Sequence, residues 1–103
     1  MATLSTHVLD TAAGRPAAGV PVTLLAPDGT VLGEGVTDAD GRVASVGPDL
    51  APGTYRLRFV TAAHLGEHAF YPEVDVVFRI AADEHHHVPL LLSPHGYTTY
   101  RGS

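Results

Sequence analysis

The sequence predicts an all-β sandwich, built as one domain with a single short helix. Apolar and polar residues alternate with a period of two in several short runs, which is typical of half-buried strands. Clusters of Gly, Pro and Asp separate these runs and predict turns. The chain has 103 residues, so we expect one domain over 1–103 and too little length for a second.

The first half of the chain predicts four strands. They cover 3–10, 20–24, 30–37 and a short run from Arg42, with a loop over 11–19 and turns at 27–29 and 38–41. In the first strand, Leu4, Thr6 and Val8 share one face, so Ser5, His7 and Leu9 lie on the other. The turn before Arg42 contains Gly41, the residue type that most readily takes the positive φ of such turns.

The second half predicts four more strands. They cover 54–61, 73–80, 86–92 and a last run from about 97 to the end, with a short helix over 62–68. In each of the first three strands alternate apolar residues point inward, for example Tyr55, Leu57 and Phe59. Pro89 lies inside a strongly β-forming run and has no N–H to donate. It therefore predicts a break or an edge in that strand.

Composition excludes several kinds of chemistry. The chain has no Cys, Trp, Lys, Asn or Gln, and all six of its basic residues are Arg, so disulfides, thiolate nucleophiles and lysine Schiff bases are excluded. A net charge of −5 argues against binding to nucleic acid or an anionic membrane, which both need a basic surface. The N-terminal residues lack a basic and apolar leader pattern. We therefore expect a cytoplasmic protein whose partner is a small molecule.

Three consecutive histidines form the densest polar feature. On a strand, His85 and His87 share one face and His86 points to the other. A metal site would need a third ligand, for which His7 is a candidate. No recognised metal spacing is present, so histidines on a solvated strand edge are the better interpretation. We expect no metal and no cofactor.

Arg42, His7 and the C-terminal segment are the other candidates. Arg42 after a turn is usually solvated, but a guanidinium can also clamp a carboxylate or a urea-like edge with two hydrogen bonds. In isolation, His7 is best interpreted as a half-buried strand residue. The segment from Pro94 stays β-prone and aromatic almost to Ser103, unlike a fraying end, and this suggests docking.

Several motifs together resemble a known family. They are Leu4-Ser5-Thr6-His7-Val8-Leu9-Asp10-Thr11, Thr37-Asp38-Ala39-Asp40-Gly41-Arg42, and the block HHVPLLLSPHGYTTYRGS that ends at Ser103. With them the chain resembles the transthyretin-related 5-hydroxyisourate hydrolases of purine catabolism. The resemblance covers essentially the whole chain. It implies a prealbumin-like (transthyretin-like) antiparallel β-sandwich that forms a homotetramer with active sites at the dimer–dimer interface.

The resemblance also implies the site residues. By motif, the catalytic set falls on His7, Arg42, His87 and Ser103. Further contacts to the substrate, besides those of His7 and Arg42, are expected from Thr98, Leu91, Tyr100, Arg101 and Gly102.

The implied reaction is hydrolysis of a ring amide in 5-hydroxyisourate, which gives 2-oxo-4-hydroxy-4-carboxy-5-ureidoimidazoline in urate degradation. One of His7 and His87 would activate water, and the other would orient it or supply a proton. Arg42 would hold the urea-like edge, while Tyr100 and Ser103 complete the pocket. Which histidine is the base stays open in the sequence.

Two other functions compete with this one. Segments such as GVPVTLL and LAPGTYRLRF are also typical of non-catalytic sandwich modules, although an isopeptide-forming module needs the Lys that is absent here. A small-ligand carrier like transthyretin is the second alternative. It needs no acid–base pair, so His7, Arg42 and the terminal tetrapeptide favour the hydrolase.

Overall fold

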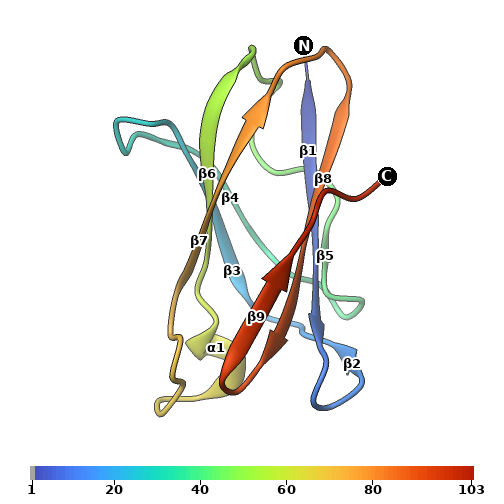
Figure 1. Cartoon of the computed structure of the whole chain (residues 1–103), viewed down its shortest axis with the longest axis vertical. Coiled ribbons are helices and arrows are strands. Elements are labelled where there is room, and N and C mark those ends of the chain that lie inside the picture. Colours follow the sequence, from blue (N-terminus) through green and yellow to red (C-terminus); the bar gives the residue numbers. More distant parts are fainter. Residues whose placement is uncertain (1) are drawn as a thin grey trace.

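The computed structural model describes residues 2–103, which fold into two facing β-sheets (Figure 1). The strands are β1 (Thr3–Asp10), β2 (Arg15–Pro16), β3 (Pro21–Leu25), β4 (Val31–Val36), β5 (Arg42–Val43), β6 (Gly53–Phe59), β7 (Val74–Ile80), β8 (His85–Ser93) and β9 (Gly96–Thr99). The helix α1 covers Ala62–Leu65. This confirms the predicted β-sandwich with one short helix. In the part of the chain described, no helix is long and apolar enough to span a lipid bilayer.

The two sheets contain different numbers and orders of strands. One has the order β2-β1-β8-β9, with β5 also paired to β1, and the other has the order β4-β3-β6-β7. All pairings but one are antiparallel. The exception is the pair of β1 and β8, which run parallel over the whole length of β1, with Ser5 opposite His87 and His7 opposite Pro89. This parallel pair joins strands from opposite ends of the chain, so no short turn could have revealed it.

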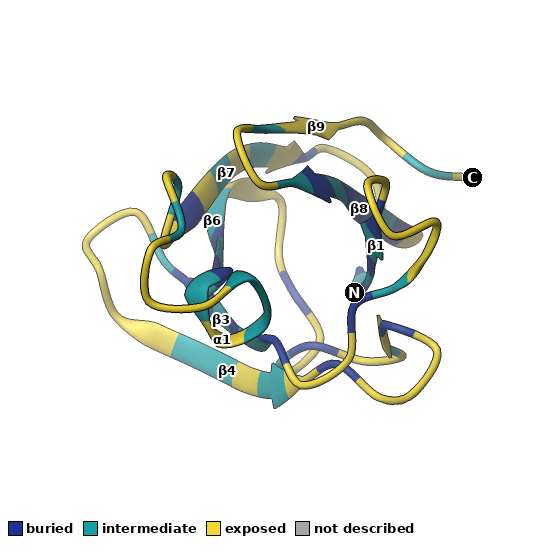
Figure 2. Cartoon of the chain, turned by 90° about the horizontal axis from the view of Figure 1, so that it is seen from below, coloured by how far each residue is buried: buried dark blue, intermediate teal, exposed yellow. Residues whose placement is uncertain are grey.

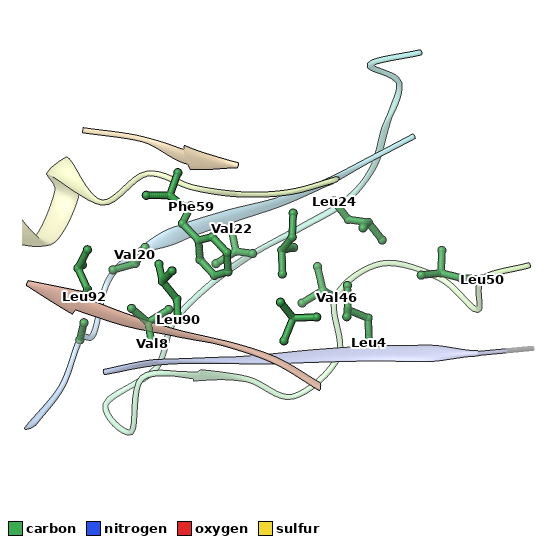
Figure 3. Close-up of a cluster of buried hydrophobic side chains, with 14 of the residues drawn as sticks. Leu4, Val8, Val20, Val22, Leu24, Val46, Leu50, Phe59, Leu90 and Leu92 are labelled. Carbon is green, nitrogen blue, oxygen red and sulfur yellow. The ribbon is translucent and has the colours of Figure 1, made fainter. Parts of the chain in front are cut away.

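The core lies between the sheets and is formed by the predicted inward faces (Figure 3). Val8 and Leu90 from one sheet and Val22, Leu24 and Phe59 from the other are almost fully buried. The other faces of β1 and β8 carry polar side chains that point away from this core. The alternation in the sequence therefore separates a packing face from a face that is free to hold a site.

Some elements differ from their predicted extent. The loop predicted over 11–19 contains β2, which pairs with the end of β1. The helix stops at Leu65, because Gly66 follows with a φ of 97°. Pro89 does not interrupt β8 itself, which is continuous over nine residues. The last strand ends at Thr99, and only Gly102 pairs again beyond it, with His87.

Candidate active site

The outer face of β1, β5 and β8 brings the predicted polar residues together. His7 lies directly opposite Arg42 in the β1–β5 pair, and Ser5 lies opposite His87 in the β1–β8 pair. Partners in register point to the same side of a sheet, so these four side chains share one face. The face draws on three separate segments of the sequence.

The turn before β5 fixes the position of Arg42. The carboxylate of Asp38 accepts hydrogen bonds from the backbone N–H groups of Asp40, at 2.9 Å, and Arg42, at 3.0 Å. Gly41 has a φ of 74°, and a Cβ on it would lie 2.3 Å from the carbonyl oxygen of Val8, so only glycine fits there. The same turn holds His7, whose Nε2 lies 2.8 Å from the carbonyl oxygen of Asp40.

The contact with Asp40 determines which nitrogen of the neutral His7 ring carries the proton. A carbonyl oxygen can only accept, so Nε2 of His7 carries the proton and Nδ1 is left with its lone pair. The side chain of His7 is half-buried. Its Nδ1 is therefore the ring atom that remains available to a ligand.

A pocket of about 350 Å³ opens on this face. It is lined by Ser5, Thr6, Arg42, Val43, Ala44, His85, His87 and Ser103. Three of the four predicted catalytic residues, Arg42, His87 and Ser103, are thus in one pocket. His7 is not among its lining residues, but it lies across the sheet from Arg42.

The tail reaches this pocket because of Pro89. The β8–β9 ladder ends at the pair Leu90 and Thr99, and the hydroxyl of Thr99 donates to the carbonyl of Pro89 at 2.7 Å. Pro89 has no N–H with which to continue the ladder, so the chain leaves β8 at this point. It returns at Gly102, whose N–H donates to the carbonyl of His87 at 2.8 Å. Figure 2 shows the exposed tail running outside β8.

Gly102 is pressed against the catalytic candidate. A Cβ at this position would lie 2.4 Å from Cδ2 of His87, a distance that no side chain can adopt without moving the ring. The absence of a side chain at Gly102 therefore lets the tail pass over His87 and delivers Ser103 to the pocket.

The other predicted contacts are spread more widely. Tyr100 and Arg101 line a second pocket of about 320 Å³ between β7 and the tail, which also includes one side of His87. The guanidinium of Arg101 donates to Glu84 at 2.7 Å. Thr98 and Leu91 face each other in the β8–β9 pair, outside both pockets. Within one chain, these four residues do not meet at the first pocket.

Two neighbours of His87 were not predicted as site residues. Oγ of Ser5 lies 2.8 Å from Nδ1 of His87 and 2.7 Å from Nε2 of His85. The shared faces of residues 5 and 7 and of residues 85 and 87 were visible in the sequence. The parallel register that places Ser5 between the two rings was not.

The pKa of His87 is lowered from its ordinary value. Partial burial of the ring is the largest cause, followed by the positive charge of Arg42 and by the neighbouring rings of His7 and His85. His87 is therefore neutral at neutral pH. Its Nδ1 is hydrogen-bonded to Ser5, and no residue among 2–103 hydrogen-bonds to its Nε2.

The three consecutive histidines do not form one cluster. His86 is buried on the core side, with Nδ1 2.9 Å from the carbonyl oxygen of Glu84, while His85 and His87 face the pocket. Among residues 2–103, no group of three His, Cys, Asp or Glu side chains is placed to hold a metal ion. The chemistry open to this pocket is that of imidazole, guanidinium and hydroxyl groups acting on a polar ligand.

Comparison with known proteins identifies the family of this chain. Residues 4–102 match the model of a family described as the HIUase/Transthyretin family. The chain belongs to this family. It is 47% identical to a 5-hydroxyisourate hydrolase of Caulobacter vibrioides, with all of both chains covered. It is 48% identical to a probable 5-hydroxyisourate hydrolase of Caenorhabditis elegans, over 99% of this chain and 82% of the relative.

Solved structures in the HIUase/Transthyretin family share this fold. The 5-hydroxyisourate hydrolase of Klebsiella pneumoniae matches with a TM-score of 0.90 and 40% identity over the whole of both chains. Sea bream transthyretin in complex with thyroxine matches with a TM-score of 0.85 and 33% identity over 96% of this chain and 93% of the other. The same sandwich thus occurs in a 5-hydroxyisourate hydrolase and in a transthyretin solved in complex with thyroxine.

Proposed function

We propose that this protein hydrolyses 5-hydroxyisourate to 2-oxo-4-hydroxy-4-carboxy-5-ureidoimidazoline, a step of urate degradation in purine catabolism. The observation that carries the proposal is the single pocket lined by His87, Arg42 and Ser103, with His7 opposite Arg42 on the same face. The relatives with 44–48% identity and nearly complete coverage of this chain are named as 5-hydroxyisourate hydrolases or probable ones.

We assign His87 as the general base. Its Nδ1 is occupied by Ser5 and its pKa is lowered, so Nε2 of the neutral ring is the atom that would take a proton from water. The oxygen of that water then forms a bond to the ring carbonyl, and the bond from this carbonyl to the ring nitrogen breaks. The departing nitrogen takes up one proton, so the two hydrogens of water are divided between the leaving nitrogen and the new carboxyl group.

Arg42 and His7 would assist this step. The guanidinium of Arg42 can donate two parallel hydrogen bonds to the urea-like edge of the substrate and offset the charge that develops on the carbonyl oxygen. Nδ1 of His7 is free to orient the water or, when protonated, to supply the proton to the leaving nitrogen. Ser103 would hydrogen-bond at the wall of the pocket, and Gly102 would allow it to reach there.

We also propose that the site is completed in a homotetramer, between two dimers. Arg42, His85 and Ser103 are exposed in the isolated chain, so one side of the pocket is open to solvent. Thr98, Leu91, Tyr100 and Arg101 lie outside the first pocket of their own chain. A neighbouring subunit would both close the pocket and offer another copy of such residues to it.

A carrier of small ligands is the second candidate. The structural match to sea bream transthyretin in complex with thyroxine supports it. A carrier or a structural module would use the same sandwich without turning over its ligand. Catalysis therefore separates the two candidates.

The test is an ultraviolet assay with freshly prepared 5-hydroxyisourate. We expect the protein to accelerate the decay well above the spontaneous rate, and the His87→Ala variant to return it close to that rate. Exhaustive chelation should leave the wild-type rate unchanged, because the described residues offer no metal cluster. Decay at the spontaneous rate with wild-type protein would refute the hydrolase function. Activity that is lost on chelation and restored by zinc would refute the metal-free mechanism.

A further inference from the structure

Ser5 and His85 form a hydrogen-bonded chain behind the proposed base. Nδ1 of His87 lies 2.8 Å from Oγ of Ser5, and this oxygen lies 2.7 Å from Nε2 of His85. Nδ1 of His85 in turn lies 2.6 Å from Oγ1 of Thr3. The chain runs from the half-buried His87 to the exposed His85, so it connects the pocket with the surface.

The single hydrogen of the Ser5 hydroxyl restricts the tautomers of both rings. Ser5 can donate to only one of the two nitrogens, so the other ring must donate to Ser5. If Nδ1 of His87 carries the proton, Ser5 donates to Nε2 of His85, and His85 in its neutral form donates from Nδ1 to Thr3. The opposite arrangement puts the proton of His87 on Nε2, and this form cannot accept a proton from water.

We propose that Ser5 and His85 are positioning residues that hold His87 with Nε2 unprotonated and then carry its surplus proton toward solvent. The inference rests on the proposed role of His87 as the base. When Nε2 takes a proton from water, Nδ1 of His87 passes its proton to Oγ of Ser5 as the Ser5 hydroxyl passes its own to Nε2 of His85. One proton enters and one leaves His87, so the ring stays neutral and the charge moves to His85.

The environments of the two rings favour this direction. His87 is partly buried and faces the positive charge of Arg42 from β5, with His7 of β1 and Ser103 of the tail on the same side. An imidazolium is poorly stabilised in such surroundings. His85 is exposed, so water can stabilise the charge there and accept the proton.

The test compares Ser5→Ala with Ser5→Thr, which keeps a hydroxyl, and with Ser93→Ala. The last variant removes a hydroxyl from β8, the strand of His87, where Ser93 donates to the carbonyl of Gly96 outside the pocket. We expect kcat of Ser5→Ala to fall about 10- to 100-fold at nearly constant KM, the range that loss of a group supporting a reactive side chain produces. Ser5→Thr should recover most of this loss, and Ser93→Ala should stay within about twofold of wild type, as expected for a site away from the pocket.

The relay predicts a second kinetic signature. We would measure kcat as a function of the fraction of heavy water in the solvent. The curve should indicate that two or more protons move in the rate-limiting step of wild type and that only one moves in Ser5→Ala. The amide of His85→Gln can still hydrogen-bond to Ser5, but it cannot take up a proton to become a cation. This variant should therefore also show a single moving proton and a lowered kcat. Equal dependence in all three proteins, or kcat of Ser5→Ala within twofold of wild type, would overturn the proposal.

A spectroscopic readout separates this proposal from the function itself. Nitrogen-15 NMR of the histidine rings should show His87 as the Nδ1–H tautomer in wild type and as a mixture in Ser5→Ala. This measurement needs no substrate, so it tests the hydrogen-bonded chain even if the assay shows no hydrolysis. A neutral His87 protonated on Nε2 in the wild-type protein would refute the assignment.

Discussion

At the residue scale, the surroundings of His87 lower its pKa, and we expect this to set the pH range of the proposed site. It meets Arg42 and two other imidazoles on one face of the sheet, and all of them disfavour its protonation. Ser5 and Gly102 contact His87 without adding positive charge. A base that stays neutral below the ordinary histidine range suits hydrolysis by activated water.

The first prediction concerns the acid side of the pH profile. The lowered pKa of His87 should place the fall of kcat/KM below the ordinary histidine value of about 6.5. Arg42→Ala removes a charge that lowers this pKa, so the fall should move to higher pH. Arg42→Lys keeps the charge and serves as the matched control, with a fall near that of wild type. A wild-type fall centred above pH 6.5, or a profile flat to well below pH 5, would contradict this role.

The same shift affects stability. His87 binds a proton less readily when folded than when unfolded, so the unfolded chain gains protons first as the pH drops below about 6.5. The free energy of unfolding should therefore decrease below that pH and level off, for this group, below its folded pKa. In His87→Gln this contribution should be missing from denaturant titrations across the same pH range.

Gly102 gives the second prediction. Gly102→Ala would place a Cβ 2.4 Å from Cδ2 of His87, so we expect the ring to be displaced and the turnover to be lost. The matched control is Gly96→Ala, whose Cβ would meet nothing closer than Oγ of Ser93 at 3.6 Å. Turnover and thermal melting should be measured on both. Full activity of Gly102→Ala would show that the tail does not pass over His87 in the working enzyme.

Among the elements, the tail after β9 is attached to the sandwich by few contacts. Its backbone returns to β8 through the N–H of Gly102, and Arg101 adds an exposed ion pair with Glu84. Exposed pairs of this kind contribute about 0–1 kcal/mol. The core residues lie elsewhere, between the two sheets.

The third prediction follows from this separation. Deletion of residues 100–103 should abolish turnover, because Ser103 is removed from the pocket and the cover over His87 is lost. The melting temperature and the far-ultraviolet circular dichroism should change little, since no buried core residue is removed. Retained activity, or a variant that fails to fold, would contradict the separate roles of tail and sandwich.

The end of β1 is tied to α1 by a partly buried pair. Asp10 accepts from the N–H of Ala13 at 2.8 Å, and its other oxygen lies 2.7 Å from Nε2 of His64. The hydrogen bond from Ala13 and the one from His64 lower the pKa of Asp10. The carboxylate therefore stabilises the fold above its ordinary pKa, and this contribution is lost as the pH falls through the lowered value.

The fourth prediction tests this pair. Asp10→Ala should lower the free energy of unfolding at neutral pH by about 1.5–3 kcal/mol, the range for hydrogen bonds to a charged group. Asp28→Ala is the control, because Asp28 accepts from the N–H of Thr30 in an exposed turn and should cost less. Chemical denaturation at neutral pH measures both. Equal losses in the two variants would show that the link between β1 and α1 adds no stability of its own.

The sequence predicts these elements better than it predicts their pairing. Alternation identifies the inward residues such as Val22 and Leu90, because the period of a strand depends only on local geometry. It cannot give the parallel register of β1 and β8, which depends on contacts between residues about 80 positions apart. The bridging position of Ser5 follows from that register. The motifs nevertheless pointed to His87, Arg42 and Ser103, which share a pocket.

At the scale of the whole molecule, the proposed site of a single subunit is open on one side. The pocket lies on the outer face of a sheet, and exposed Arg42 and Ser103 form part of its wall. A subunit that covers this face would exclude water from the reacting groups and strengthen their electrostatic interactions. Activity is therefore expected to depend on assembly.

The fifth prediction is a loss of specific activity on dilution. Sedimentation should show a tetramer at working concentration, and turnover per chain should fall in step with dissociation. Added excess of the inactive His87→Ala protein should restore part of the rate at high dilution, because mixed assemblies can still pair an intact pocket with a covering neighbour. Full turnover in a proven monomer would refute the shared site.

The parallel pairing of β1 and β8 also has a consequence for how the protein is made. Ser5 and His87 lie 82 positions apart in the chain, and the tail that completes their pocket comes later still. Contacts of such long range slow folding, because a large loop must close before they form. During synthesis, β1 cannot pair with β8 until residues 85–93 have left the ribosome. The pocket is thus one of the last parts of this sandwich that can form.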